Sequence, residues 1–276
     1  MLGKQLPMPS IPGQPGERSR IGRGRRMAGM SAIEWTDATW NPWMGCEKVS
    51  PGCAHCYMYR EQRQYGHDPS ALRRSKTKFH EPLRWADQRL VFTCSWSDWF
   101  HPGADQWRDE AWDIIRCTPH LTYQILTKRP ELIPGRLPAD WGAGFANVWL
   151  GVSIENSRFT WRADRLREVP AAIRFISAEP LIGSLFDGTG NRQPLSLKGI
   201  DWVIAGGESG PRSRRLDLAW VDELANTCDE AGVAFFMKQL GTPLARELGA
   251  SDRKGGEIAS FPQRLRRREM PALVSS

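Results

Sequence analysis

Three cysteines lie close together in one short segment of the N-terminal quarter of the chain. Cys46, Cys53 and Cys56 are spaced CxxxxxxCxxC, and Pro51 and Gly52 indicate that the backbone turns between the first two. Thiolates are ligands of zinc and of iron–sulfur clusters. A cluster of four irons takes four thiolates, so three cysteines leave one iron with an open position at which another molecule can react. The spacing therefore indicates a metal centre.

A structural zinc ion is the alternative interpretation of this loop. The three thiolates would then need a histidine to close a tetrahedron, and the candidates are His55, His67 and His80. A disulfide is disfavoured because no secretory signal opens the chain and three cysteines cannot all pair with one another. The remaining cysteines lie among apolar residues, where we expect them to be buried as small hydrophobic side chains: Cys94, Cys117 and Cys228.

Short apolar runs that position further polar residues recur along the chain, and most are followed by a helix-like stretch. The expected strands are 33–36, 90–94, 122–126, 148–152, 172–176, 200–205 and 234–237, and the expected helices are 56–65, 104–117, 157–168 and 218–231. Strands that alternate with helices form parallel sheets. We predict an α/β fold, a partial or full (β/α) barrel of the TIM type with about six or seven parallel strands, and a doubly wound open sheet is the alternative.

Polar residues follow each expected strand, at the end where a parallel barrel carries its reactive groups. A carboxylate beside an apolar strand is costly unless it is paired, and the basic residues in the same positions are natural partners. The candidates, in chain order, are Ser95, Ser97, Asp98, Lys128, Arg129, Ser153, Glu155, Glu179, Gly206, Gly207, Glu208 and Lys238. Tryptophans crowd the same approach, and packing is their simpler role: Trp35, Trp40, Trp43, Trp96 and Trp99.

The net charge of +7 on 276 residues is concentrated at the two ends. Residues 1–29 contribute +5 and the residues from Phe261 contribute +3, which leaves the body at about −1 and argues against a large phosphate-binding face there. We expect residues 1–29 to be a disordered basic extension, with Met30 as a candidate start, residues 30–245 to be the barrel domain, and residues 246–276 to be a basic tail. No long apolar run indicates a membrane span, and we expect a cytoplasmic protein.

The ordered set of motifs resembles the phage-type three-cysteine-motif family, a divergent branch of the radical S-adenosylmethionine (SAM) superfamily that occurs in phages and bacterial genomes. The resemblance covers about Met30 to Gly241. It rests on the segments 34–42, 45–57, 97–101, 126–130, 150–156, 177–181, 206–210 and 236–239. The common superfamily spacing is CxxxCxxC, and its Gly-Gly-Glu usually follows the second strand. Here Gly-Gly-Glu follows the sixth, so the second strand offers Ser95, Ser97 and Asp98 in its place.

The resemblance implies a partial barrel, a [4Fe-4S] cluster on Cys46, Cys53 and Cys56, and cleavage of SAM to a 5′-deoxyadenosyl radical. SAM has an amine, a carboxylate, a ribose and an adenine, so its site needs acceptors, cations or amide donors, and a flat apolar wall. All twelve polar candidates except Lys238 are predicted to contact the cofactor. The predicted catalytic residues are Lys128, Glu155 and Lys238.

Two classes of function follow. The first is a radical SAM enzyme, with SAM and a reducing electron donor as partners and nucleic acid as the first candidate substrate. The second is a zinc-stabilised protein without catalysis that binds nucleic acid or a partner through its basic ends. Chain length favours the first, because a small zinc module needs no seven-stranded sheet with polar clusters on one rim.

Overall fold

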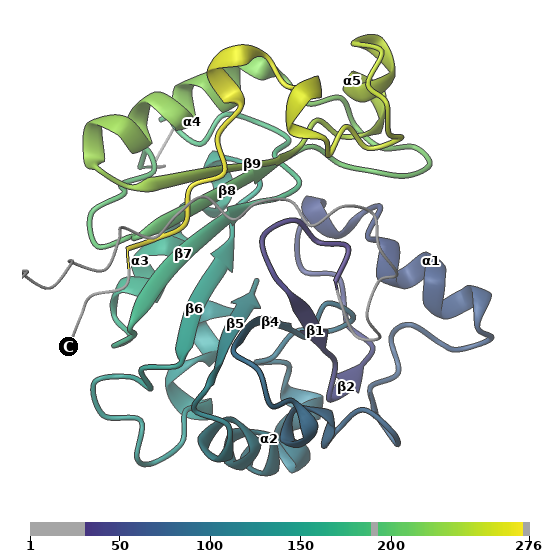
Figure 1. The fold of residues 1–276 in the computed structure, drawn as a ribbon, viewed down its shortest axis with the longest axis vertical. Coiled ribbons are helices and arrows are strands. Elements are labelled where there is room, and N and C mark those ends of the chain that lie inside the picture. The colour runs from purple at the N-terminus through teal and green to yellow at the C-terminus, as the bar shows by residue number, and fades with distance from the viewer. Residues whose placement is uncertain (1–30, 189–192, 273–276) are drawn as a thin grey trace, which may run out of the picture.

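A seven-stranded parallel sheet forms the centre of the protein (Figure 1). The computed structural model describes residues 31–188 and 193–272. All pairings in the sheet are parallel, and the strands lie in the order β1-β4-β5-β6-β7-β8-β9. The strands are β1 (Ala38–Trp40), β4 (Arg89–Thr93), β5 (Leu121–Thr127), β6 (Val148–Ser153), β7 (Ile173–Ala178), β8 (Trp202–Gly206) and β9 (Ala234–Gln239).

The order of the strands decides between the two predicted architectures. Neighbours in the sheet follow one another along the chain, without the reversal of direction that marks a doubly wound sheet. The sheet curves into a half-barrel, which confirms the partial TIM-type barrel (Figure 1). Val, Ile and Phe dominate its strands because both faces of a parallel sheet are covered: every residue of β6 and β8 is buried.

The prediction of a strand at residues 33–36 is wrong. These residues form bends and turns, and the first strand begins at Ala38. The Thr36 hydroxyl donates to the carbonyl oxygens of Ala38 and Leu90, while Trp35 is buried against Phe92 on the inner side of the sheet. The apolar residues of this segment therefore cover the inside of the half-barrel instead of extending its edge.

The helices are α1 (Tyr57–Gln64), α2 (Asp105–Cys117), α3 (Trp161–Arg167), α4 (Leu218–Ala231) and α5 (Thr242–Glu247). The first four were predicted, although α3 is shorter than expected because residues 157–159 form a separate 3-10 turn. The ends of α4 show why its bounds are sharp. Asp217 caps its first turn by accepting from the Ala219 N–H, and Gly232 ends it in the left-handed conformation.

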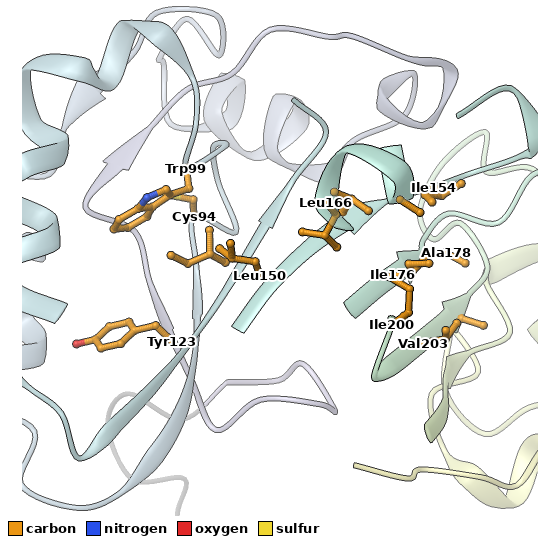
Figure 2. Packing of buried hydrophobic residues seen from close by; sticks show 14 of the residues in the cluster. Cys94, Trp99, Tyr123, Leu150, Ile154, Leu166, Ile176, Ala178, Ile200 and Val203 are labelled. Carbon is orange, nitrogen blue, oxygen red and sulfur yellow. The ribbon is translucent and has the colours of Figure 1, made fainter. Parts of the chain in front are cut away.

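Two hydrophobic clusters hold the layers together. The larger one fills the space between the sheet and the helices, and Figure 2 shows Leu150, Ile176 and Val203 of the sheet in the same cluster as Leu166 of α3. The smaller one is mainly aromatic and includes Trp35, Phe92, Phe175 and Trp202, the residues that line the inside of the curve. A packed interior leaves only the carboxyl ends of the strands available for a cavity.

A small antiparallel sheet positions the cysteine loop. It consists of β2 (Trp43–Met44) and β3 (Arg73–Arg74), and β2 leads directly into Gly45 and Cys46. Gly45 has a positive φ of 102°, and a Cβ there would lie 2.4 Å from the Ala71 carbonyl oxygen, so only glycine fits this approach. The loop then runs through a 3-10 turn (Pro51–Cys53) into α1.

The C-terminal segment packs against the sheet instead of extending from it as a tail. Residues around 267–269 pair with β9: the Met237 N–H donates to the Arg267 carbonyl, and the Glu269 N–H donates to the Phe235 carbonyl. Phe261 and Leu265 are buried in the core. The boundary expected at residue 245 therefore does not mark the end of the packed structure.

The interval 186–198 contains no helix or strand among its described residues. The expectations for residues 1–29 and for the last four residues lie outside the described residues. No helix in the described part of the chain is both long and apolar enough to span a membrane.

Candidate functional site

A cavity of about 620 Å³ opens at the carboxyl ends of the strands, under the cysteine loop. Its apolar part is formed by the inner aromatic cluster, with Trp35, Phe92 and Leu126. Its polar part contains the three cysteines of the loop together with ten of the twelve predicted polar residues. These are Ser95, Ser97, Asp98, Lys128, Arg129, Ser153, Glu179, Gly207, Glu208 and Lys238, whereas Glu155 and Gly206 do not line it.

The three loop cysteines are free thiols and are partly buried. Burial raises the pKa of Cys46 to about 12, with the negative charge of Asp98 adding to the effect, and burial also raises the pKa of Cys56. Both groups are therefore neutral thiols at pH 7 in the metal-free chain. A bound cation would reverse this balance and release protons, because metals bind the thiolate.

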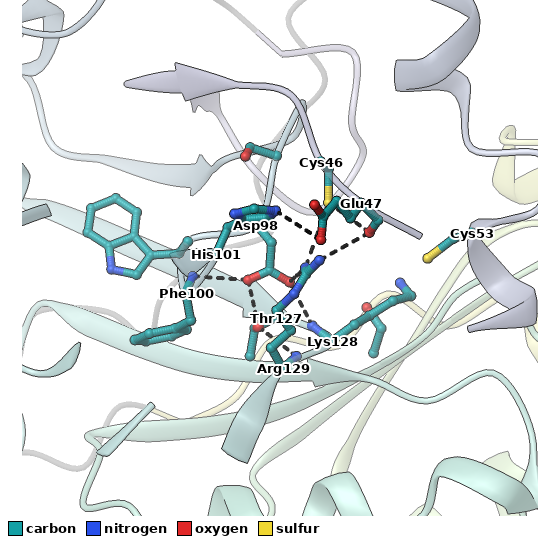
Figure 3. A network of polar contacts seen from close by, with 12 residues as sticks. Cys46, Glu47, Cys53, Asp98, Phe100, His101, Thr127, Lys128 and Arg129 are labelled. Carbon is teal, nitrogen blue, oxygen red and sulfur yellow. Dashed lines mark hydrogen bonds and ion pairs between the residues drawn. The ribbon is translucent and has the colours of Figure 1, made fainter. Parts of the chain in front are cut away.

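Asp98 and Arg129 fix the first cysteine of the loop (Figure 3). The Asp98 carboxylate accepts from the Thr127 hydroxyl at 2.7 Å and from the Lys128 N–H at 3.0 Å, and it pairs with the Arg129 guanidinium at 3.3 Å. Arg129 in turn donates to the Glu47 carbonyl at 3.1 Å, and its Nη1 lies 3.7 Å from Cys46 Sγ. These contacts join β4 and β5 to the loop, so Asp98 has little capacity left for a ligand.

Glu155 holds the second turn of the loop. It is 0% exposed, accepts from the Gly52 N–H at 3.2 Å, and pairs with the buried Arg162 at 2.8 Å. A Cβ on Gly52 would lie only 2.8 Å from Glu155 Oε1, so glycine is needed where the carboxylate meets the backbone. The structure thus places Glu155 against the loop, and its side chain does not line the cavity. The catalytic and cofactor-binding role expected for it stays a prediction.

Glu208 holds the same turn from the other side. It forms a two-point ion pair with Arg214, at 2.5 and 2.9 Å, and Arg214 also donates to the Pro51 carbonyl at 3.1 Å. The Arg214 hydrogen bonds hold the pKa of Glu208 below its usual value, against the opposing effect of burial. Glu208 reaches the cavity, but its charge is already matched.

The serines that follow β4 support the segment that precedes the cysteines. The Ser97 hydroxyl donates to the Gly45 carbonyl at 2.6 Å, and the Ser95 hydroxyl bonds with the Asn41 side-chain amide at 2.9 Å. The Tyr57 hydroxyl donates to the Ser95 carbonyl at 2.7 Å and so ties α1 to the same strand end. Both serines line the cavity with hydroxyl groups that are already engaged.

Glu179 and Lys238 form the pair that faces the cavity. Their side chains are 2.9 Å apart and are 13% and 18% exposed. Ser177 donates to the second Glu179 oxygen at 3.2 Å, and Gly206 makes room because a Cβ there would lie 2.7 Å from the carboxylate. Gly206 therefore acts by its lack of a side chain and not by contact with a ligand. Lys128 also lines the cavity, and its ammonium has no ion pair among the described residues.

One family model matches this chain. It covers residues 30–262 and is described as a protein of unknown function, DUF5131. The chain belongs to the DUF5131 family. No curated protein and no solved structure matches it. The matched region of this DUF5131 chain extends beyond the expected boundary at residue 245, in agreement with the packed C-terminal segment.

The three thiols of this DUF5131 chain are ligands of the type that binds an iron–sulfur cluster. Three thiols from one loop line one cavity, which lysines and carboxylates also line. Within the described ranges, no three His, Cys, Asp or Glu side chains come close enough together to hold a single ion. Cys46, Cys53 and Cys56 would therefore need to come closer together to bind one ion. Among the other cysteines, Cys94 and Cys228 are buried as expected, whereas Cys117 is exposed.

The sequence did not point to Arg162 and Arg214, which form ion pairs with Glu155 and Glu208. A usable signal was present: each arginine follows its glutamate by six or seven residues, in the first turns after the strand. Packing is the role expected for Trp35, and its side chain is 3% exposed, although it also borders the cavity. Trp40, Trp43 and Trp99 are packing residues of the core.

Proposed function

We propose that this protein is a radical SAM enzyme. The observation that supports the proposal is the shared cavity: a loop with three cysteines covers the carboxyl ends of a parallel half-barrel, and its thiols border the same space as Glu179, Lys238 and Lys128. A [4Fe-4S] cluster held by the three thiolates would supply the electron that cleaves SAM to a 5′-deoxyadenosyl radical.

The residues of the chain would bind and orient SAM. Lys128 and Lys238 offer cations for its carboxylate, and Glu179 offers an acceptor for its amine or ribose. Trp35, Phe92 and Leu126 form a flat apolar wall suited to a purine ring. The same wall excludes water from the inner end of the cavity, which protects a reactive radical.

The three carboxylate–arginine pairs would hold the cysteine loop in place over this cavity. Asp98–Arg129, Glu155–Arg162 and Glu208–Arg214 contact it near Cys46, at Gly52 and at Pro51 respectively. We assign them positioning roles. We also propose that the protein works in the cytoplasm, where thiols stay reduced, and that it needs a reducing electron donor.

Anaerobic reconstitution of the full chain tests the proposal. We expect about four irons per chain and a cluster whose electron paramagnetic resonance spectrum changes when SAM is added, together with 5′-deoxyadenosine as a product. Replacing any one of Cys46, Cys53 and Cys56 by alanine should abolish both the iron and the product. Cys117→Ala is the matched control, because this exposed thiol lies outside the cavity. A colourless protein that takes up one zinc and leaves SAM intact would overturn the proposal.

A further inference from the structure

Two aromatic rings lie together at the edge of the cavity. Trp96 borders the cavity, and the Tyr65 ring lies 6.1 Å from it with 33° between the ring planes. Tyr65 directly follows α1 and is 67% exposed, which is the largest exposure among the large hydrophobic residues of the described chain. An aromatic side chain so exposed gains little from the core, and its free ring face is available to a planar ligand.

Basic residues without a close ion pair lie on the elements that border the cavity. Arg60 and Arg63 lie on α1, Lys128 is in the cavity, and Arg212 is in the turn after β8. A Cβ on Gly210 would lie 2.7 Å from Arg60 Nη1, so α1 and the Arg212 turn meet at the same edge. In the described structure Arg63, Lys128 and Arg212 form no ion pair, and Arg60 has only a contact of 3.9 Å with Glu61.

Several arginines elsewhere on the surface are matched by a carboxylate, whereas the exposed Arg84, Arg158, Arg246 and Arg253 form no ion pair in the described structure. Arg116, Arg165, Arg167, Arg215, Arg264 and Arg267 each pair with an aspartate or glutamate. The last two belong to the C-terminal segment whose positive charge first indicated a nucleic-acid contact, so that charge is already used within the fold. Among the carboxylates that line the cavity, Asp98, Glu179 and Glu208 are matched by Arg129, Lys238 and Arg214, whereas Glu47 and Glu61 have only contacts of 3.9 Å with His101 and Arg60. The charge of Arg63 also acts on Asp68.

We propose that this edge binds single-stranded nucleic acid, with a base stacked on Tyr65 and Trp96 and with its phosphates on the neighbouring cations. Aromatic faces interleaved with basic side chains are the arrangement that holds unpaired strands, and a base in a duplex has no free face to offer. A stacked nucleotide would lie at the entrance of a cavity of about 620 Å³. The inference names the substrate class of the proposed enzyme and in that respect rests on the proposed function. Binding of the strand itself needs neither iron nor SAM.

Fluorescence anisotropy of the full chain with a labelled oligonucleotide of about 15 nucleotides tests the inference. We expect the single strand to bind more tightly than the duplex of the same sequence. Measurements with a DNA probe and with an RNA probe show which of the two nucleic acids the protein prefers. Tyr65→Ala should weaken binding about 5- to 100-fold, while Tyr65→Phe, which keeps the ring face, should bind as the wild type does. Arg63→Ala should weaken binding and lower the salt slope by about 0.7.

Arg165→Ala is the matched control for charge, because Arg165 is an exposed arginine on α3 away from the cavity edge. It should leave the affinity unchanged. The inference fails if Tyr65→Ala binds as tightly as the wild type, or if the duplex competes equally with the single strand. Metal-free protein serves for all these measurements, so a chain that binds the strand without cleaving SAM would refute only the proposed function. One that cleaves SAM and ignores the strand would refute only this inference.

Discussion

Four acidic residues that look alike in the sequence have two different roles in the structure. Asp98, Glu155 and Glu208 each pair with an arginine, and one partner of each pair contacts the cysteine loop, whereas Glu179 pairs with Lys238 inside the cavity. The position after an apolar strand predicted that each carboxylate would need a cation, and this holds for all four. It did not identify Arg162 and Arg214, because only basic residues at the strand ends were expected as partners and these two arginines lie further along, in the segments that follow the strands.

The Glu155–Arg162 pair gives a test at this scale. Glu155→Gln removes the negative charge but keeps an oxygen that can accept from Gly52, so Arg162 is left buried without a counter-charge. We expect the free energy of unfolding to fall by about 3 kcal/mol, because an unpaired buried charge is strongly destabilising. Urea unfolding followed by circular dichroism measures it. Glu168→Gln, which removes the partner of the exposed Arg165, should change stability little. Equal unfolding of the Glu155 variant and the wild type would contradict the role we give this pair.

At the scale of elements, the hydrophobic pattern predicted six of the seven strands and four helices. It did not predict the first strand, at one edge of the sheet, or the segment that covers the other edge. The strand expected at 33–36 failed because Trp35 turns inward to the aromatic cluster, a choice that depends on Phe92 and Trp202 far along the chain. The far edge, β9, is covered by the segment that was expected to be a tail. An unpaired strand edge is a liability, and residues 267–269 remove it.

Glu269 makes that edge sensitive to acid. Burial alone would raise its pKa, but hydrogen bonds from Arg267 and the Phe235 N–H outweigh burial and lower the pKa below the usual 4.5. The stabilisation is therefore complete above pH 4.5 and is lost as the pH falls through the lowered value. We expect Glu269→Gln to be less stable than the wild type at pH 7 and to lose less stability on acidification, as measured by urea unfolding at several pH values.

Glu230→Gln is the control for this comparison, since Glu230 is an exposed carboxylate on α4 without an ion pair in the described structure. Its pH profile should match that of the wild type. Parallel profiles for the Glu269 variant and the wild type would show that the carboxylate does not stabilise the edge.

At the scale of the whole molecule, the alternation of strands and helices predicted the half-barrel, and composition predicted its ends less well. Charge counting separated residues from Phe261 onward as a basic group, yet Arg264 and Arg267 pair with Asp222 and Asp229 on α4. Net charge cannot distinguish arginines that bind a ligand from arginines that form ion pairs within the folded protein. That distinction needs the positions of their partners.

Truncation tests whether the C-terminal segment belongs to the folded unit. A chain that ends at residue 245 would lose the buried Phe261 and Leu265, expose the edge of β9 and leave the Trp202 indole without its Glu269 acceptor. We expect it to be insoluble or to lose the cooperative thermal transition seen by circular dichroism, because core side chains and strand pairing are lost together. A chain that ends at residue 272 should melt as the full chain does. Unchanged melting of the shorter chain would restore the boundary at 245.

The attachment of the cysteine loop sets an order for the biosynthesis of this protein. Gly52 is fastened by a residue 103 positions later, and Pro51 by one 163 positions later. The three cysteines therefore leave the ribosome well before Glu155 and Arg214 have been synthesised. During that interval the cysteine loop lacks the contacts that hold it in the folded protein. Insertion of the proposed cluster would therefore be a late event, after the whole chain has been synthesised and folded.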